Sequence, residues 1–401
     1  MSEPGFRFKE GKLYAFSKRS VMILEAWPAL KALRKEDDSY WEEFDPRFRV
    51  VHPYRPRKPK QTPQLELSLG AVQVKSSVSE QRRRAFDSFR FSLPKPIAAA
   101  VKKFQNRQWV LLKLMQKVES ALELARLNPA LCFSLANYHQ FGCRSTTLER
   151  AACLASRRQR EISEWLGFPG TVSTAKILSR IPPESASLEL LKPLSRAMHD
   201  PDFTKILSHQ PVLNAGVISI LLVEGFRNGA TPAFLSEVAK IPAEKYRASI
   251  VEMLVDTLKM LQEVKPNAGT PKIQSLARLR SMHDEVSAEY LRNLPPRSRS
   301  EPLPTPPLRG TKTIIPILTF DELSQESRAQ QNCVATYAER IRKRTTFVYR
   351  VTHPERATLS IVRSHSGDWQ IGELECGANT EVSPITRIAV ESWLGQFALS
   401  I

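Results

Sequence analysis

The side chain that could most directly do covalent chemistry is the thiol of Cys333. A catalytic thiolate needs a neighbouring base or positive charge, because an ordinary cysteine has a pKa of about 8.5 and is mostly protonated at neutral pH. The residues that could activate this thiol or donate to an oxyanion are His353, His365, Arg356, Asn332 and Asn379. A cysteine-dependent reaction is therefore one candidate activity.

A structural role for Cys333 competes with this hypothesis. In a helix over residues 321–342, Cys333, Val334, Tyr337 and Ile341 would form one apolar stripe, which would make the cysteine a small buried hydrophobic residue. No local signature of a known thiol enzyme accompanies it. The sequence leaves open whether the protein is an enzyme.

A second set of polar residues lies in the same C-terminal region. Its members could converge at one end of a sheet and line a ligand-binding cleft: Gln331, Asn332, Tyr337, Arg356, Glu373 and Asn379. The alternative is a structural ion pair between Arg356 and Glu373 on neighbouring strands. Both alternatives remain open.

The chain shows no sequence pattern typical of a metal or nucleotide-cofactor site. Cys132, His139, Cys143 and Cys153 match no familiar zinc spacing, and His283 falls beside an apolar helical stripe. Neither a P-loop nor a dinucleotide-binding glycine motif occurs. We therefore expect no metal and no cofactor, and we expect His283 to be a hydrogen-bonded core residue.

Charge is the strongest signal in the sequence. The chain carries 59 Lys and Arg against 41 Asp and Glu, and this net charge of +18 favours a polyanion as partner. Residues 51–109 alone hold thirteen basic and three acidic residues. The side chains predicted to contact phosphates are Arg55, Arg57, Lys58, Lys60, Arg82, Arg83, Arg84, Arg90, Lys102, Lys103, Arg107, Arg157 and Arg158. DNA or RNA is the expected partner.

Aromatic residues lie among these charges and could stack on unpaired bases. They are Tyr54, Phe86, Phe89, Phe91 and Trp109. The alternative is that the rings anchor an extended basic arm onto the protein while the charges stay solvated. No helix-turn-helix, zinc finger or RNA-recognition motif is readable, so sequence-specific recognition has little support.

The elements that must position these residues follow from hydrophobic periodicity. Residues 1–95 form a basic region whose overall fold the sequence leaves undecided. Within it, a strand pair is predicted at 6–8 and 13–16 and a helix at 20–33. Helices are predicted over 101–126 and over 146–165, the second starting at a Thr146–Glu149 capping box and ending before Gly167. Further helices are predicted over 175–179, 188–198, 212–224, 233–239, 244–263 and 273–292.

The chain is therefore expected to be α+β, with a large mostly helical body and a small C-terminal domain. Residues 96–293 should form a helical bundle, and the six-proline segment 294–310 an extended linker. The C-terminal domain over 311–401 has the predicted order β-α-β-β-β-α. Its elements cover residues 314–318, 321–342, 346–352, 357–363, 369–375 and 384–399.

The C-terminal residues resemble a known family. Gln331-Asn332-Cys333-Val334, Phe347 to Val351, Arg356 to Ile361, Trp369 to Leu374 and Trp393-Leu394 are similar to the PcfJ-like proteins of bacterial conjugative plasmids and other mobile elements. The resemblance covers roughly residues 100–401. It implies a context of DNA mobility or defence and no particular reaction. Many relatives carry histidine where this chain has Asn332, so a His-Cys chemistry does not transfer.

The function we predict is a nucleic-acid-binding accessory protein of a bacterial mobile-element or defence system. Its C-terminal domain would bind a ligand or a protein partner encoded nearby on the same element. Five cysteines without disulfide-scaffold spacing, and no signal-like or membrane-spanning apolar segment, favour a cytoplasmic protein with no membrane partner. A cysteine-dependent enzyme using Cys333 and a protein–protein adaptor are the alternatives.

Overall fold

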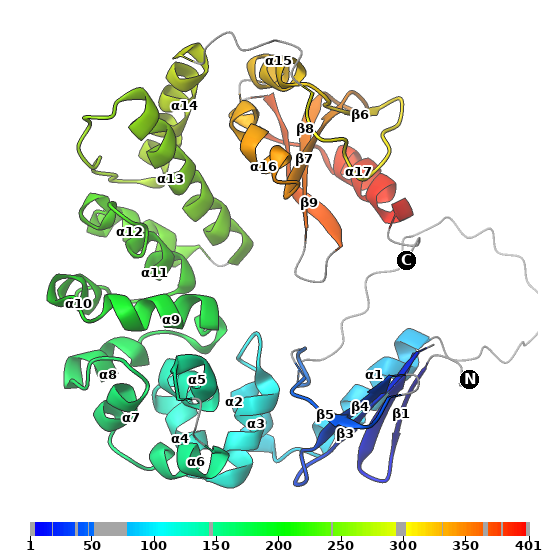
Figure 1. The fold of residues 1–401 in the computed structure, drawn as a ribbon, viewed down its shortest axis with the longest axis vertical. Helices are drawn as coiled ribbons and strands as arrows, with labels where there is room; N and C mark the ends of the chain where they lie inside the picture. Colours follow the sequence, from blue (N-terminus) through cyan, green and yellow to red (C-terminus); the bar gives the residue numbers. More distant parts are fainter. Residues whose placement is uncertain are drawn as a thin grey trace, which may run out of the picture. The chain divides into compact units, whose positions relative to one another are not determined.

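The computed structural model describes residues 5–17, 19–36, 39–46, 48–51, 78–143, 147–241, 244–293, 302–330, 332–363, 368–377 and 380–397. It divides the chain into two compact units, Met1–Ala248 and Ser249–Ile401. Each unit combines helices with an antiparallel sheet, which confirms the predicted α+β class (Figure 1). The division falls within helix α13 (Glu244–Val264), whereas the sequence suggested a boundary at the proline-rich segment.

The first unit begins with a five-stranded antiparallel sheet in the order β1-β2-β3-β4-β5. Its strands are β1 (Gly5–Lys9), β2 (Lys12–Phe16), β3 (Ser20–Glu25), β4 (Ala32–Glu36) and β5 (Glu42–Glu43). The predicted strand pair is confirmed, whereas the predicted helix over 20–33 is wrong. Every residue from Val21 to Leu24 is apolar, so periodicity alone did not separate strand from helix, and the β-branched Val21 and Ile23 favour the strand.

Helix α1 (Val78–Phe91) covers one face of this sheet by packing on β1 and β2. The ring of Phe86 lies 6.2 Å from that of Phe6 and 5.9 Å from that of Phe48, measured between centroids. The prediction of an extended arm is therefore wrong from Val78 onward, because a helix with an apolar face buries these rings. Residues 52–77 lie outside the described part of the chain.

Helices make up the rest of the first unit. They are α2 (Lys95–Val101), α3 (Gln108–Lys117), α4 (Ser120–Leu127), α5 (Pro129–Ala136), η1 (Tyr138–Phe141), α6 (Leu148–Ala155), α7 (Gln159–Trp165), α8 (Val172–Ser179), η2 (Pro183–Ser185), α9 (Leu188–Ala197), α10 (Pro201–Ser208), α11 (Ala215–Leu221), η3 (Arg227–Gly229) and α12 (Pro232–Lys240). Neighbours in the chain pack together, as α4 does on α5, α7 on α8 and α11 on α12 (Figure 1). No helix in the described ranges is both long and apolar enough to cross a membrane.

Two of the helices predicted in the first unit are divided. The helix predicted over 101–126 is α3 followed by α4, with an extended Val118 between them, and Val101 is the end of α2. Before α3, Arg107 takes a left-handed φ of 53°, and the buried side chain of Gln108 donates to the carbonyls of Val101 and Phe104. The helix predicted over 146–165 is α6 followed by α7. Its N-cap is Thr147 instead of Thr146, and Gly167, with a φ of 79°, follows the end of α7 as predicted.

The second unit contains the rest of α13, then α14 (Leu276–Asn293), and a five-stranded antiparallel sheet in the order β10-β9-β8-β7-β6. Its remaining elements are β6 (Ile314–Pro316), α15 (Phe320–Gln330), η4 (Val334–Tyr337), α16 (Ala338–Arg342), β7 (Thr346–Val351), β8 (Ala357–Arg363), β9 (Trp369–Cys376), β10 (Thr380–Glu381) and α17 (Pro384–Phe397). The predicted β-α-β-β-β-α order is present. The helix expected over 321–342 is divided into α15, η4 and α16, and β10 is an addition.

The second half of the predicted linker belongs to the core of the second unit. Leu303 and Leu308 are buried, and the backbone N–H of Leu303 donates to the carbonyl of Leu318 at 2.7 Å. The hydroxyl of Tyr349 donates to the carbonyl of Leu308 at 2.8 Å. Residues 302–310 of the predicted linker are therefore part of this folded unit, while 294–301 lie outside the described part.

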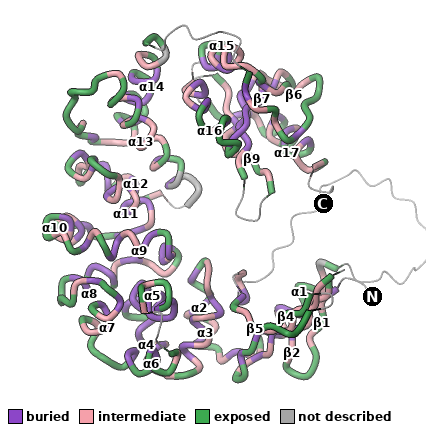
Figure 2. Tube along the Cα trace, viewed as in Figure 1, coloured by how far each residue is buried: buried purple, intermediate pink, exposed green. Residues whose placement is uncertain are grey.

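The two faces of the C-terminal sheet differ in polarity. Tyr349, Leu359 and Leu374 are partners across β7, β8 and β9, and the ring of Tyr349 lies 5.0 Å from that of Trp393 on α17. The alternate residues form the opposite, polar face, which includes Arg350, Thr358, Ser360, Glu373 and Glu375. Much of β7 and β8 is buried (Figure 2). Polar groups on such a face require hydrogen-bond partners.

Candidate functional site

A buried carboxylate organises the polar face of the C-terminal sheet. The side chain of Glu326 on α15 is fully buried and accepts hydrogen bonds from Arg350 Nε at 2.8 Å and from Thr358 Oγ1 at 2.8 Å. Arg356 adds a two-pronged contact, with Nη1 and Nη2 at 2.9 and 2.5 Å from the two carboxylate oxygens. Burial by itself would raise the pKa of Glu326, but these donors outweigh it and lower the pKa below its usual value.

Arg356 therefore has a different partner from the one we expected. The predicted Arg356–Glu373 ion pair is wrong, because Glu326 holds the guanidinium. Glu326 was missed, although the sequence gives a signal: it lies three residues after the apolar Leu323, and therefore on the same buried side of α15. A carboxylate at such a position needs a cation.

Glu373 takes a separate set of partners. Its carboxylate accepts a hydrogen bond of 2.5 Å from the hydroxyl of Tyr337, and its backbone N–H donates to Ser360 Oγ at 2.9 Å. The guanidinium of Arg340 lies 4.8 Å from the centre of the Tyr337 ring and is ion-paired with Asp256. Burial, followed by nearby negative charge, holds the pKa of Tyr337 well above its usual value. This tyrosine is therefore a protonated hydrogen-bond donor at neutral pH.

The predicted cleft residues thus divide between two hydrogen-bonded groups. Asn332 donates from Nδ2 to Thr358 Oγ1 at 3.2 Å and accepts from the backbone of Val334 at 3.2 Å, so it joins the Glu326 group and shapes the turn before η4. Tyr337 and Glu373 make the other group. Gln331 and Asn379 lie outside the described residues. Most of the polar atoms that we expected to face a ligand are bonded to other protein atoms.

Cys333 lacks the environment of a nucleophile. It precedes η4 instead of lying within the expected α-helix, and it packs on the apolar core. Burial, with the charges of Glu373 and Asp256, raises the pKa of its thiol to about 12. Of its three expected activators, Arg356 is held by Glu326, His353 is exposed, and His365 lies outside the described residues. The thiol therefore remains protonated at neutral pH.

The candidate metal residues do not converge. Cys132 is fully buried, whereas Cys153 is exposed on α6. In the described ranges, no three His, Cys, Asp or Glu side chains are grouped so that they could hold a metal ion. His283 is buried and its Nδ1 lies 2.9 Å from Thr257 Oγ1, which confirms the prediction of a hydrogen-bonded core histidine. Burial lowers its pKa.

The charge of the chain is concentrated in the first unit. Residues 249–401 hold 19 Lys and Arg against 17 Asp and Glu, whereas residues 1–248 hold 40 against 24. Within the second unit, Glu375 lies near Glu373, and burial together with that charge raises the pKa of Glu375 to about 7. A polyanion would therefore meet its complementary charge on the first unit.

The predicted phosphate-contacting residues of α1 differ in their surroundings. Arg83 and Arg84 are exposed and both approach Glu80, at 3.8 and 2.5 Å. Arg90 is ion-paired with Asp87 at 2.7 Å. The two pairs with Glu80 are weak in water, so Arg83 and Arg84 remain available to a phosphate, whereas the Arg90–Asp87 pair is partly buried.

The remaining basic candidates lie in turns between helices. Lys102 and Lys103 are exposed between α2 and α3, and Arg107 directly precedes α3. Arg157 and Arg158 are exposed between α6 and α7. Arg55, Arg57, Lys58 and Lys60 lie outside the described residues.

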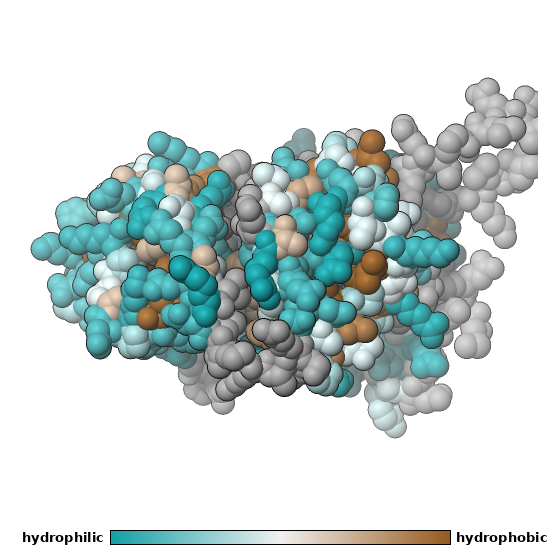
Figure 3. Space-filling view, turned by 90° about the horizontal axis from the view of Figure 1, so that it is seen from above, coloured by the Kyte–Doolittle hydropathy of each residue, from teal (hydrophilic) through white to brown (hydrophobic). Residues whose placement is uncertain are grey.

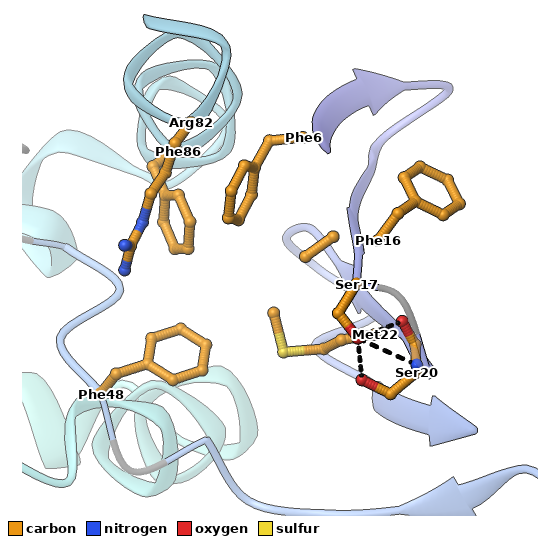
Figure 4. Close-up of a pocket in the computed structure, with 9 residues that line it drawn as sticks. Phe6, Phe16, Ser17, Ser20, Met22, Phe48, Arg82 and Phe86 are labelled. Atoms are coloured by element: carbon orange, nitrogen blue, oxygen red, sulfur yellow. Dashed lines mark hydrogen bonds between the residues drawn. The ribbon is translucent and has the colours of Figure 1, made fainter. Parts of the chain in front are cut away.

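A hollow of about 300 Å³ lies between the sheet and α1 (Figure 4). Phe6, Phe48, Phe86 and Met22 line it, and the guanidinium of Arg82 lies over the rings of Phe6 and Phe86 at 5.5 and 5.7 Å. Arg82 is therefore a part of this aromatic cluster as well as a surface cation.

A chain of contacts leads from this hollow to the turn between α2 and α3. Phe48 contacts Phe86, and the next residue, Arg49, donates from Nη2 to the carbonyl of Lys102 at 3.4 Å. Arg49 Nε is buried without a hydrogen-bond partner in the described part of the chain. Phe48 and Arg49 thus link α1 to the turn between α2 and α3. Sequence reasoning missed Arg49, whose only signal was its place beside Phe48.

Most of the aromatic residues proposed for base stacking are core residues. Phe86, Phe89 and Trp109 are buried, and the rings of Phe89 and Trp109 pack at 6.1 Å. Their anchoring role is the alternative that the sequence left open. Phe91 is 81% exposed, and Tyr54 lies outside the described residues.

No protein-family model, curated protein or solved structure matches the chain. The resemblance to PcfJ-like proteins therefore stays a prediction.

Proposed function

We propose that the protein binds nucleic acid through its first unit, with phosphates held along the surface that joins α1 to the α2–α3 turn. The contact chain from Arg82 through Phe48 and Arg49 to Lys102 carries this proposal. It links the two elements that carry these cations, which would then form one basic stripe. A groove or stripe of this kind neutralises several phosphates at once without reading base sequence.

The lysines of the α2–α3 turn are the strongest phosphate ligands on this surface. Lys102 and Lys103 are exposed, and neither is ion-paired with a described acidic residue. An exposed ammonium group retains its full charge for an incoming phosphate and releases a counterion from it. Both residues belong to the set that the sequence predicted.

The context of this binding comes from the C-terminal resemblance. A PcfJ-like chain would be an accessory protein of a bacterial mobile element or defence system. The nearly balanced charge of the second unit supports a role other than polyanion binding for that unit, such as contact with a protein partner. Sequencing the nucleic acid that copurifies with the chain tests the context: enrichment of mobile-element sequence supports it, and an unselected host sample opposes it.

Fluorescence anisotropy across a salt series tests the binding surface. We expect the Lys102→Ala/Lys103→Ala variant to bind DNA and RNA of any sequence more weakly and to flatten the slope of log K against log salt by about 2, since each lost phosphate contact removes about 0.9. The matched control is Lys259→Ala/Lys272→Ala, which removes the same charge from exposed positions of the second unit. An equal effect of both variants, or no binding at low salt, would overturn the proposal.

A further inference from the structure

The second face of the N-terminal sheet carries an ordered set of aromatic and basic side chains. Phe6 and Met22 point to the face that meets α1, where both line the hollow. The pairing register places the intervening residues on the opposite face. Phe16 belongs to the lining of the hollow, but its ring turns away from Phe6, Phe48 and Phe86 in Figure 4.

Two rows of cross-strand partners on this face contain its aromatic and basic side chains. In the first, Arg7 of β1, Tyr14 of β2 and Ile23 of β3 are partners across the strands. In the second, Phe16 of β2 is paired with Val21 of β3, which is paired with Lys35 of β4. The two aromatic residues therefore share strand β2, with Arg7 on the neighbouring β1 and Lys35 two strands away on β4.

The two rings are oriented alike. Tyr14 and Phe16 have centroids 6.1 Å apart and planes only 5° from parallel. Both side chains are partly exposed to solvent. The two rings are thus parallel to each other, and neither belongs to the buried core.

The cations complete the arrangement. Arg7 and Lys35 are exposed, and they lie on opposite sides of the aromatic pair. Lys12, on the next row, is instead ion-paired with Glu25 at 2.8 Å. The face thus combines stacking surfaces at its centre with positive charge at its sides, which matches the bases and phosphates of a nucleic-acid strand.

We propose that this face binds two unpaired nucleotides of a single-stranded nucleic acid, with bases on Tyr14 and Phe16 and phosphates near Arg7 and Lys35. The proposal rests on the proposed function and narrows its substrate class. In a duplex the flat faces of the bases are covered by their neighbours, so a sheet surface meets only backbone and groove edges. An unpaired base can turn its flat face to an aromatic side chain.

The test compares single strands with duplexes of the same sequence, using the full chain and anisotropy. Tyr14→Leu/Phe16→Leu keeps apolar volume on the sheet but removes the rings. We expect it to lose about 10- to 100-fold in affinity for single-stranded DNA and RNA, in line with the measured effect of removing stacking residues, and less than about twofold for duplexes. The matched control is Tyr40→Leu, because Tyr40 is 93% exposed in the segment that precedes β5.

The outcomes separate this proposal from the one before it. Suppose that the Lys102→Ala/Lys103→Ala variant loses affinity while Tyr14→Leu/Phe16→Leu binds single strands as the parent does. That result would support the phosphate-binding surface and overturn the stacking proposal. Loss of affinity for both kinds of strand by the ring variant also overturns the stacking proposal. Failure of the parent chain to bind any nucleic acid overturns both.

Photocrosslinking gives a second measurement that does not depend on a variant folding. A single strand containing 5-iodouridine, irradiated on the parent protein and digested, should attach to the peptide that carries Tyr14 and Phe16. Attachment confined to other peptides would overturn the assignment of the face.

Discussion

Replacing Glu326 by glutamine tests whether the buried carboxylate is the main stabiliser of the C-terminal sheet. Glu326 is fully buried, and it faces Arg350, Arg356 and Thr358. Removing one partner of a buried ion pair costs about 3–5 kcal/mol, because the other charge is left uncompensated. Here the arginine side chains are 31% and 36% exposed and can regain water, so we expect a loss just below that range, about 2–3 kcal/mol.

Native-state hydrogen exchange is the appropriate assay, since a chain of two units need not unfold in one transition. At neutral pH the free energy of opening measured at the amides of β7 and β8 should be lower in Glu326→Gln than in the parent, by the amount estimated above. The matched control is Glu391→Gln, which makes the same charge change at an exposed position of α17 and should leave protection unchanged.

The stabilisation that Glu326 provides should also depend on pH. The folded pKa of Glu326 lies below its unfolded value, so its contribution is present above that unfolded value and is lost as the pH falls through the folded one. The difference between parent and variant in thermal melting should shrink in acid. A variant whose protection at neutral pH stays within about 0.5 kcal/mol of the parent would refute the reasoning, because that is the range of an ordinary surface substitution.

Two further predictions concern the neighbouring titratable groups. Burial and the charge of Glu373 raise the folded pKa of Glu375 above its unfolded value to about 7, so the second unit should lose stability as the pH rises through 7. This loss should amount to about 1–2 kcal/mol for a half-buried group, and it should be absent in Glu375→Gln. Melting temperatures that fall equally with rising pH in the parent and the variant would contradict this prediction. Because burial raises the pKa of Cys333 to about 12, iodoacetamide near neutral pH should modify the exposed Cys153 and spare Cys333 until the chain unfolds. Rapid modification of Cys333 in the folded protein would restore the enzyme hypothesis.

Local signals predicted local structure well. The strand at 6–8 alternates in polarity, the paired strand at 13–16 is rich in large apolar residues, and Gly167 supplies the left-handed residue that ends a helix. The C-terminal order of elements followed from similar patterns. The helix predicted over 20–33 failed because a wholly apolar run has no period to read, so the choice depended on pairing with β2.

The site depended on contacts that no local pattern contains. Arg356 meets Glu326 across 30 positions of sequence, and Arg49 reaches the carbonyl of Lys102 across 53. The charge excess directed attention to the basic segment but gave no information on which of its cations lie close together in the fold. Tyr14 and Phe16 were not singled out in the sequence, because only the register between strands places Arg7 and Lys35 on the same face of the sheet.

The segment 302–310 determines where the chain could be cut without loss of its C-terminal fold. Leu308 and Arg309 offer carbonyls to the hydroxyl of Tyr349 and to Nε1 of Trp393, at 2.8 and 3.0 Å. A fragment starting after Gly310 would leave both donors buried and unsatisfied. The segment 302–310 holds two leucines that are buried in the core and several prolines that reduce the conformational entropy of the free peptide. A synthetic peptide of this sequence should therefore bind the truncated fragment noncovalently and supply the two missing carbonyls.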